Sequence, residues 1–316
     1  MKILIIYNEY LYKGGEDTYI QSLISLLKNK GHKVFFYKKS SLSIKTLEDK
    51  IKLAFRLFYN NKTHQELSLV IKKFNPDIAH FHNIFPLIGA TAYRVCHQYK
   101  VPIIQHIHNY RFVCPKTSLY RNGKICELCP KRKTLIPSLI YGCYHSSRVA
   151  SFIFVCAFYY HKLIGSFSFI NQYIFPSIFT QRYYQKYLGL TKKQINNLPY
   201  FINIPKKIIK PPIDYKYYLF VGRLTQEKGI VRLLEQFSKI QENIIVIGDG
   251  PLKDSLYQKY KKFKHIKFIN YSSKKKVYSY IKYSKAVVIP SEWYEVLPLV
   301  YLEAICLNKK VFIQNI

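Results

Sequence analysis

At 316 residues, 49% of them apolar, the chain is long enough to form about two domains with an ample core. It has no run of 18 uncharged apolar residues, and its most apolar stretch, 149–160, is too short to span a bilayer. Seven cysteines, an odd number, and an N-terminus without a signal-peptide cleavage site favour a cytoplasmic protein over a disulfide-bonded secreted one.

The net charge of +33 favours anionic partners and leaves three explanations open. An AT-rich genome would make Lys, Asn, Ile and Tyr abundant without any functional selection. Peripheral attachment to the anionic inner face of a membrane is the second explanation, since each basic residue near such a surface adds about 1 kcal/mol. Nucleic-acid binding is the third. The chain has no helix-turn-helix, zinc-finger or RNA-recognition signature, so we expect no specific nucleic-acid partner.

The chain opens with a strand, a glycine-containing loop and a helix. An apolar strand is expected at 3–7, and the loop after it ends in Gly14 and Gly15. The helix that follows ends at Gly31, and its apolar face consists of Tyr19, Leu23, Leu26 and Leu27. Paired glycines either let the backbone approach a ligand closely or serve a tight turn with positive φ, and the spacing does not decide between the two.

Two later strands end in histidines. After a strand at 34–37 and a helical region at 44–75, short strands are expected at 76–82 and 102–108. Their carboxyl ends, where a cleft would lie, carry His80, His82, His106 and His108. A metal site is one interpretation. Because no ligand of another type accompanies the histidines, we favour hydrogen bonding to a ligand instead.

A cysteine-containing insert is expected at about 109–145. Its C-x11-C-x2-C-x13-C spacing is typical of a tetrahedral structural zinc site formed by Cys114, Cys126, Cys129 and Cys143. Residues 121–124 indicate a turn between these cysteines. Buried reduced thiols, or a redox pair formed by Cys126 and Cys129, are the alternatives.

The domain boundary is expected in an extended, Lys- and Pro-rich linker at 205–216. Before it come an aromatic helix at 146–165, either core or interfacial, and a strand that leads into a helix capped by Ser177. The first domain is therefore predicted to span 1–204, with the insert, and the second 217–316.

The second domain is expected to begin with a strand and a basic loop. Gly222 frees the turn, and Arg223 and Lys228 stand before a helix, where a cation is unfavourable unless an anion is bound. The forked guanidinium and the compact ammonium suit the oxygens of a diphosphate. A basic helix N-terminus without a ligand is the alternative.

The remaining elements alternate in the same way. A strand at 244–247 turns into a helix through Gly248 and Gly250. Further expected elements are a strand at 266–269, a helix at 274–283, a buried parallel strand at 286–289 and a last strand at 310–313.

Two glutamates follow the buried strand at 286–289. Glu295 falls in the next loop, and Glu303 lies eight positions later, about two turns into a helix that has Pro298 in its first turn. Taken alone, Glu295 suits a helix N-terminus and Glu303 a solvated helix position. At the carboxyl end of a strand, however, the pair can face one anionic, hydroxyl-rich ligand.

Over nearly its whole length the chain resembles the retaining glycosyltransferases of family 4. The segments that carry the resemblance are the G-R-L-x-x-x-K-G run at 222–229, the G-x-G-P turn at 248–251, the E-x7-E pair Glu295 and Glu303, and the Asn-Tyr-Arg-x-x-Cys-Pro stretch at 109–115 with its trailing cysteines.

The resemblance implies an α/β architecture, the GT-B fold with two facing Rossmann-like domains. It also implies transfer of a sugar from a nucleotide-diphosphate donor to a saccharide or lipid-linked acceptor in surface polysaccharide or glycoconjugate synthesis. The implied roles are catalysis at the donor sugar for Glu295 and His108, phosphate binding for Arg223, Lys228, Gly14 and Gly15, nucleoside binding for Glu303, Gly248 and Gly250, and the acceptor side for His82 and Asn83. No catalytic metal is expected.

Two departures from the family pattern affect these expectations. Val296 and Leu297 stand where the family has a small or polar residue and a phenylalanine, so the backbone approach to the diphosphate is restricted. The chain also ends at Ile316, just after a strand, where family members continue, so we expect a truncated second domain. A catalytically impaired remnant and a basic nucleic-acid-binding protein are the alternative functions. A phosphorylase or epimerase of similar fold is less favoured, because no motif for a lysine-bound cofactor is present.

Overall fold

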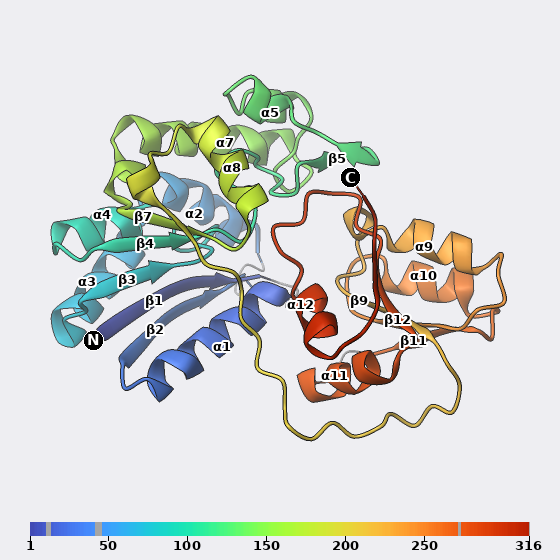
Figure 1. Cartoon of the computed structure of the whole chain (residues 1–316). Coiled ribbons are helices and arrows are strands. Elements are labelled where there is room, and N and C mark those ends of the chain that lie inside the picture. The colour runs from blue at the N-terminus through green and yellow to red at the C-terminus, as the bar shows by residue number, and fades with distance from the viewer. Residues whose placement is uncertain (11–13, 42–45, 271–272, 316) are drawn as a thin grey trace. The chain divides into compact units, whose positions relative to one another are not determined.

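The computed structural model describes residues 1–10, 14–41, 46–270 and 273–315 (Figure 1). It divides into two compact units, the first made of residues 1–117 and 127–199, the second of residues 118–126 and 200–316. The predicted domains differ from these units in two respects. The division falls at 199/200 and not at 204, and the segment 118–126 of the predicted insert is grouped with the second unit.

The first unit is built on a six-stranded sheet in which every pairing is parallel. The strand order is β2-β1-β3-β4-β7-β8. The strands are β1 (Lys2–Glu9), β2 (Lys33–Ser40), β3 (Ile78–Phe81), β4 (Ile103–His106), β7 (Gln172–Phe175) and β8 (Ile195–Asn197). This confirms the predicted α/β character. The near-continuous burial of residues 3–8 in β1 is what a central parallel strand requires, because helices cover both faces of the sheet (Figure 1).

The main helices of this unit are α1 (Gly15–Asn29), α2 (Leu47–Phe58), α3 (Asn61–Phe74), α4 (Thr91–Gln98), α7 (Arg148–Leu163) and α8 (Ile178–Leu188), with short turns α5 (Leu128–Lys131) and α6 (Pro137–Ile140). Tyr19 and Leu23 of α1 are buried as predicted, but Leu26 is exposed. Ser177 caps α8 as predicted, since its side chain accepts a hydrogen bond from the Thr180 N–H.

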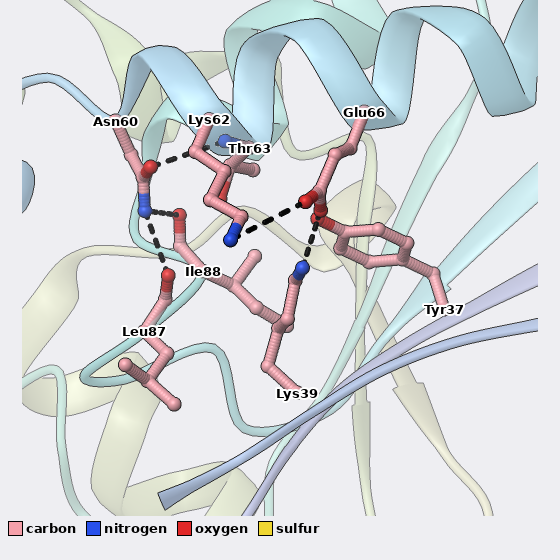
Figure 2. A network of polar contacts seen from close by, with 8 residues as sticks. All are labelled: Tyr37, Lys39, Asn60, Lys62, Thr63, Glu66, Leu87 and Ile88. Carbon is pink, nitrogen blue, oxygen red and sulfur yellow. Dashed lines mark hydrogen bonds and ion pairs between the residues drawn. The ribbon is translucent and has the colours of Figure 1, made fainter. Parts of the chain in front are cut away.

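The helical region predicted at 44–75 begins outside the described residues, and from residue 46 onward it contains two helices that meet at Asn60. The Asn60 side chain accepts from the Thr63 N–H and donates to the carbonyls of Leu87 and Ile88 (Figure 2). Asn60 thereby caps α3 and also ties its start to the loop before α4. The helix breaks there because an asparagine bonded in this way satisfies the first N–H groups of a new helix.

Of the alternatives for the helix at 146–165, burial in the core holds for one face of α7, and the interfacial alternative stays a prediction. One face of α7 is buried, including Phe154, Val155 and Phe158. The opposite face exposes Val149 and Phe152. Within the residues that the structure describes, none of the helices combines the length and the apolar character needed to cross a bilayer.

The second unit contains a five-stranded parallel sheet in the order β11-β10-β9-β12-β13. Its strands are β9 (Tyr218–Val221), β10 (Ile244–Ile247), β11 (Ile266–Ile269), β12 (Ala286–Ile289) and β13 (Val311–Ile313), and its helices are α9 (Ile230–Phe237), α10 (Lys253–Tyr260), α11 (Lys274–Tyr283) and α12 (Leu299–Cys306). Alternate residues of the strands enter two separate cores, one with α11 and α12 and one with α9 and α10.

The segment predicted as a linker, 205–216, is extended, but it is anchored to the second unit. Ile208, Ile213 and Tyr215 pack against the core cluster that α11 and α12 share with the sheet. The predicted turn at 121–124 is confirmed. Strands β5 (Tyr120–Arg121) and β6 (Lys124–Ile125) form a hairpin with positive φ at both residues of its turn.

Candidate active site

The carboxyl edge of the second sheet brings the predicted basic loop and the first predicted glutamate together. Strands β9 and β12 are neighbours at the point where the strand order changes direction, which is where open α/β sheets bind their ligands. The loop at 222–229 follows β9, and the loop at 290–298 follows β12. Gly229, with φ +70°, lies where these two loops approach each other most tightly. A Cβ on it would lie 1.8 Å from the Pro290 carbonyl oxygen, so no other residue fits there.

Lys228 and Glu295 form a half-buried ion pair in this position. The Lys228 ammonium donates to Glu295 Oε1 at 2.6 Å, and the Ser291 hydroxyl donates to the same oxygen at 2.6 Å. Lys228 also lies over the Trp293 ring, 5.0 Å from its centroid. The side chains of the pair are 24% and 17% exposed, so both charges remain accessible to a ligand. The predicted phosphate-binding lysine and the predicted sugar-binding glutamate are therefore in direct contact.

Arg223, the other predicted phosphate ligand, is exposed and forms no ion pair with any residue that the structure describes. Its backbone lies beside the second glycine-containing turn. A Cβ on Gly248 would lie 1.9 Å from the Gly222 carbonyl oxygen, so this glycine is required for the close packing of the two turns. Gly250 follows, with its N–H donating to Asp249 Oδ1. The structure thus gives Gly248 a packing role that is independent of any ligand.

Glu303, the second glutamate of the predicted pair, is completely buried in α12. Lys274, the first residue of α11, forms an ion pair with it. Its Oε1 atom is in contact with the Lys274 ammonium, whereas Oε2 accepts no hydrogen bond from any residue that the structure describes. A buried carboxylate oxygen that lacks a hydrogen bond is costly. The arrangement therefore provides one open acceptor, Oε2, for a ligand with hydroxyl groups, with the charge balanced by Lys274.

Sequence reasoning missed two residues of this group. Ser291 could have been found, because it directly follows β12 and so lies at the same sheet edge as Glu295. No sequence feature marks Lys274 as a site residue, because it is one of several consecutive lysines at the start of a helix. Only the packing of α11 against α12 brings it to Glu303. A third contact in this unit joins the β5–β6 hairpin to the same loop, where the Tyr120 hydroxyl donates to Glu292 at 2.6 Å.

In the first unit, β3 and β4 bring four histidines together at or near their carboxyl ends. His82 Nδ1 lies 2.8 Å from His108 Nε2, and the rings of His82 and His106 stack with centroids 4.4 Å apart. His106 Nε2 lies 3.2 Å from His80 Nδ1. Burial lowers the pKa of all four: that of His108 falls to about 3 and that of His80 to about 4, so the rings are neutral at physiological pH.

Three of these histidines, His82, His106 and His108, line a small cavity together with Glu16, Asn83 and Arg111. Glu16 comes from the first turn of α1, and its Oε1 accepts from the Asn83 N–H at 3.1 Å. Gly14, just before α1, has extended backbone and donates its N–H to Asp17 Oδ2, so the alternative of a positive-φ turn does not hold for it. Gly15 is the first residue of α1.

The predicted zinc ligands are divided between the two units. Cys114, Cys129 and Cys143 belong to the first unit, and Cys126 is grouped with the second. Cys114 and Cys129 are buried, and the other two are half-buried. The zinc site therefore stays a prediction.

Comparison with known proteins gives matches over almost the whole chain. The family model described as "Glycosyltransferase Family 4" matches residues 13–204, and the model described as "Glycosyl transferases group 1" matches residues 203–316. A Bacillus subtilis protein named as a teichuronic acid biosynthesis glycosyltransferase, TuaC, is 32% identical over 113 residues, which are 35% of this chain and 28% of TuaC. The match thus spans less than a third of that relative.

Solved structures match at much greater coverage and lower identity. Sucrose-phosphate synthase from Thermosynechococcus elongatus is 16% identical with a TM-score of 0.66, over 99% of this chain and 81% of the other. HepE from Anabaena, solved in complex with UDP-glucose, is 14% identical with a TM-score of 0.59, over 99% and 80%. At such identities the likeness shows the fold, and the predicted GT-B architecture is confirmed.

Proposed function

The chain belongs to glycosyltransferase family 4, and on that basis we propose that it transfers a sugar from a nucleotide-diphosphate donor to an acceptor, with retention of the anomeric configuration. The donor class is supported by the structurally similar HepE, which was solved with UDP-glucose. The acceptor that we propose is a saccharide or a lipid-linked saccharide of surface polysaccharide or glycoconjugate synthesis.

The observation that carries this proposal is the state of Glu303. Its carboxylate is completely buried, its Oε1 atom is in contact with the Lys274 ammonium, and its Oε2 atom accepts no hydrogen bond within the described part of the chain. A ribose hydroxyl that donates to Oε2 would satisfy this buried oxygen. We therefore assign Glu303 to the donor ribose and place Gly248 and Gly250 beside the nucleoside.

The leaving diphosphate would meet Arg223 and Lys228. The negative charge on its oxygens grows as the bond to the sugar breaks, so fixed cations stabilise the transition state more than the bound donor. In the structure Lys228 is paired with Glu295 at 2.6 Å. Because the two side chains are in contact, they would bind neighbouring parts of the donor. Glu295 would orient the sugar hydroxyls, and Lys228 would face the phosphate. In the first unit we assign His108 to the donor sugar, where its neutral imidazole can donate or accept one hydrogen bond. The backbone at Gly14 and Gly15 would approach the donor phosphate or the acceptor. His82 and Asn83 would line the acceptor side.

A nucleotide titration tests the donor site. UDP, GDP, ADP and a few of their sugars would be titrated into the purified chain by calorimetry. We expect one base to bind selectively, and Glu303→Ala to weaken that binding by at least about tenfold, because a charge-assisted hydrogen bond contributes roughly 1.5–3 kcal/mol.

The matched control is Glu242→Ala, which removes an exposed glutamate paired with Lys285 in the same unit. It should leave nucleotide binding unchanged. Binding that is equal in wild type and Glu303→Ala, or a folded chain that binds none of the nucleotides, would overturn the proposed donor site.

We also propose that a surface of the first unit attaches the protein to an anionic membrane, where lipid-linked acceptors are found. The surface, here called the α6–α7 apolar surface, consists of Ile136, Ile140, Tyr141, Val149, Phe152 and Leu163, all between 48% and 86% exposed. Its three α7 residues are spaced by 3 and 11 positions and so share one helix face. Exposed Arg148 and Lys162 flank it on the same helix, in a chain with a net charge of +33. An apolar face bordered by cations is typical of helices that lie in a lipid interface.

A further inference from the structure

The β5–β6 hairpin contacts the loop that carries Glu295, although it belongs to the cysteine-containing insert. Its segment 118–126 is grouped with the second unit, while the chain on either side of it belongs to the first. The Tyr120 hydroxyl donates to Glu292 Oε2 at 2.6 Å, a distance typical of a charge-assisted hydrogen bond to a carboxylate. The two residues are 172 positions apart in the chain. The proposed transfer reaction gives neither of them a role.

Tyr120 is placed so that its hydroxyl remains a donor. Its side chain is 3% exposed, whereas residues 122–124 at the tip of the hairpin are exposed. A two-stranded hairpin is at best marginally stable by itself, so it keeps its shape by packing against the rest of the unit. Burial, the bond to Glu292 and the Glu227 charge raise the pKa of the Tyr120 hydroxyl above its ordinary value of about 10. The hydroxyl therefore keeps its proton at physiological pH.

Glu292 is fixed by a second bond, at its backbone. Its N–H donates to the Glu227 carbonyl oxygen at 2.9 Å. The backbone bond joins the loop at 290–298 to the basic loop at 222–229, and the side-chain bond joins it to the hairpin. Because the two bonds lead to different segments of the chain, together they restrict where this part of the loop can lie.

The residues on either side of Glu292 contact the Lys228–Glu295 pair. The Ser291 hydroxyl donates to Glu295 Oε1 at 2.6 Å, and the Lys228 ammonium lies 5.0 Å from the centroid of the Trp293 ring. A shift of Glu292 moves both of its chain neighbours. Through them it moves the carboxylate that we assign to the donor sugar and the ammonium that we assign to the phosphate.

We propose that Tyr120 is a positioning residue for the transfer reaction. Through Glu292 it holds the loop at 290–298 in the conformation in which Glu295 and Lys228 meet the donor. This inference rests on the proposed function, and it gives the cysteine-containing insert a part in the reaction, because the insert supplies Tyr120. A misplacement of about 1 Å at the reacting groups can cost roughly 10²-fold in rate, so a hydrogen bond remote from the sugar can control turnover.

Turnover by variants of the full chain tests this role. Tyr120→Phe keeps the ring and removes only the hydroxyl. We expect kcat and kcat/KM to fall together by about 10–100-fold while KM for the donor changes by less than about twofold, because positioning acts on the transition state. Tyr257→Phe, at an exposed tyrosine of α10 in the same unit, is the matched control and should retain full turnover. A merely structural role for Tyr120 would lower the melting temperature and leave kcat of the folded enzyme unchanged.

Variants of Glu292 test whether Tyr120 acts through it. Glu292→Ala should lower kcat as much as Tyr120→Phe does, and the double variant should be no slower than either single one, because all three lack the same bond. Glu292→Gln retains an amide oxygen that can accept from the Tyr120 hydroxyl, so it should turn over faster than Glu292→Ala. Losses that simply multiply in the double variant would contradict the coupling of the two residues.

The fluorescence of Trp293, the only tryptophan of the chain, reports on the loop without any turnover. Its indole Nε1 atom is buried, so release of the loop in Tyr120→Phe should increase quenching by acrylamide. Equal quenching of the two chains, or a kcat of Tyr120→Phe equal to that of wild type, would overturn the proposal. A wild-type chain that transfers no sugar would overturn the proposed function instead. Quenching would then still test the contact, so the two failures are distinguishable.

Discussion

Arg223 and Lys228 were predicted to act together, but the structure gives them different surroundings. Lys228 is held by Glu295 and by the Trp293 ring, whereas Arg223 is exposed and forms no ion pair with the described residues. An unpaired guanidinium at the carboxyl edge of a sheet can turn toward an incoming diphosphate without losing a contact. Its contribution should therefore show in catalysis and not in stability.

We accordingly expect Arg223→Ala to lower kcat/KM for sugar transfer by about 10²–10³-fold, the usual effect of removing one group that stabilises developing negative charge. The melting temperature should not change. Arg232→Ala, at an exposed arginine of the nearby helix α9, is the matched control and should retain full turnover. Turnover that is the same in both variants would exclude Arg223 from the phosphate site.

Among the elements, α3 depends on a single capping residue that also connects it to a distant loop. Asn60 is 2% exposed, and its side chain bonds Thr63, Leu87 and Ile88 at once (Figure 2). Its own N–H donates to Thr91 Oγ1 at 3.0 Å. Nearby, Glu66 of α3 accepts from the Tyr37 hydroxyl and pairs with Lys39, both from β2. The helix is thus fixed to the sheet and to the loop by polar contacts at its first two turns.

Asn60→Ala should lower the free energy of unfolding by about 2–3 kcal/mol. About 1 kcal/mol is the loss of a cap, and the rest comes from the part-buried Leu87 carbonyl and the buried Ile88 carbonyl left without their donor. Urea unfolding measures the change. Ser273→Ala removes the exposed cap of α11 and should cost only about 1 kcal/mol. Equal losses in the two variants would show that the contacts to Leu87 and Ile88 contribute nothing.

Helices α2 and α7 are joined by a buried histidine, His161. The Leu57 carbonyl can only accept, so His161 Nε2 carries the proton and donates to it at 2.9 Å, while the Ser166 hydroxyl donates to Nδ1 at 2.9 Å. Desolvation lowers the pKa of His161, with the Arg94 charge acting in the same direction and the bond to Leu57 opposing it. In the unfolded chain, His161 becomes protonated as the pH falls through its ordinary pKa of about 6.5. In the folded chain, where its pKa is lower, the ring becomes protonated only at a lower pH.

The free energy of unfolding should therefore fall as the pH decreases from 7 toward 5, by at most about 1.4 kcal/mol per pH unit for this one histidine. Urea unfolding at pH 7.5, 6.5 and 5.5 measures the slope. Other buried histidines contribute to the wild-type slope, so the quantity of interest is the difference between wild type and His161→Gln. A variant with the same slope as wild type would show that His161 is protonated equally in both states.

For the whole molecule, the excess of 50 basic over 17 acidic residues becomes meaningful when it is combined with the α6–α7 apolar surface. Composition alone leaves genome bias, membrane and nucleic acid as explanations. An apolar helix face with flanking cations favours the membrane explanation, because nucleic acid offers no partner for the exposed aliphatic side chains of Val149 and Leu163.

We expect the protein to float with vesicles that contain an anionic lipid and not with neutral vesicles. Phe152→Ser combined with Leu163→Ser should reduce this binding about a hundredfold or more, because each substitution removes roughly 1.5–3 kcal/mol of apolar burial in the interface. Phe312→Ser, at an exposed phenylalanine of β13, is the control. Binding that is fully lost at high salt and is insensitive to the paired substitution would reduce the interaction to net charge alone. A short DNA duplex titrated at two salt concentrations tests the nucleic-acid explanation.

The sequence by itself determined the order of strands and helices and the residues at the strand ends. Strands β9, β10 and β12 and residues 3–7 of β1 are runs of consecutive apolar residues that can be identified without knowing their partners, and loops such as 222–229 and 290–298 are identified by the residues inside them. The type of fold follows, since alternating strands and helices favour a parallel sheet. Where local signals competed, as at Asn60 and Leu26, the sequence pattern was not sufficient.

The tertiary structure alone decided which of these residues meet. The Lys228–Glu295 contact, the Lys274–Glu303 pair and the histidine cluster each join residues that are 26 to 67 positions apart. Such contacts depend on which strands are neighbours in the sheet. The periodicity of apolar residues within a single strand or helix does not determine that strand order. The same holds for Gly248, whose requirement follows from the approach of another turn at 222–224. Local patterns encode the elements, whereas the chemistry of the site arises from their packing.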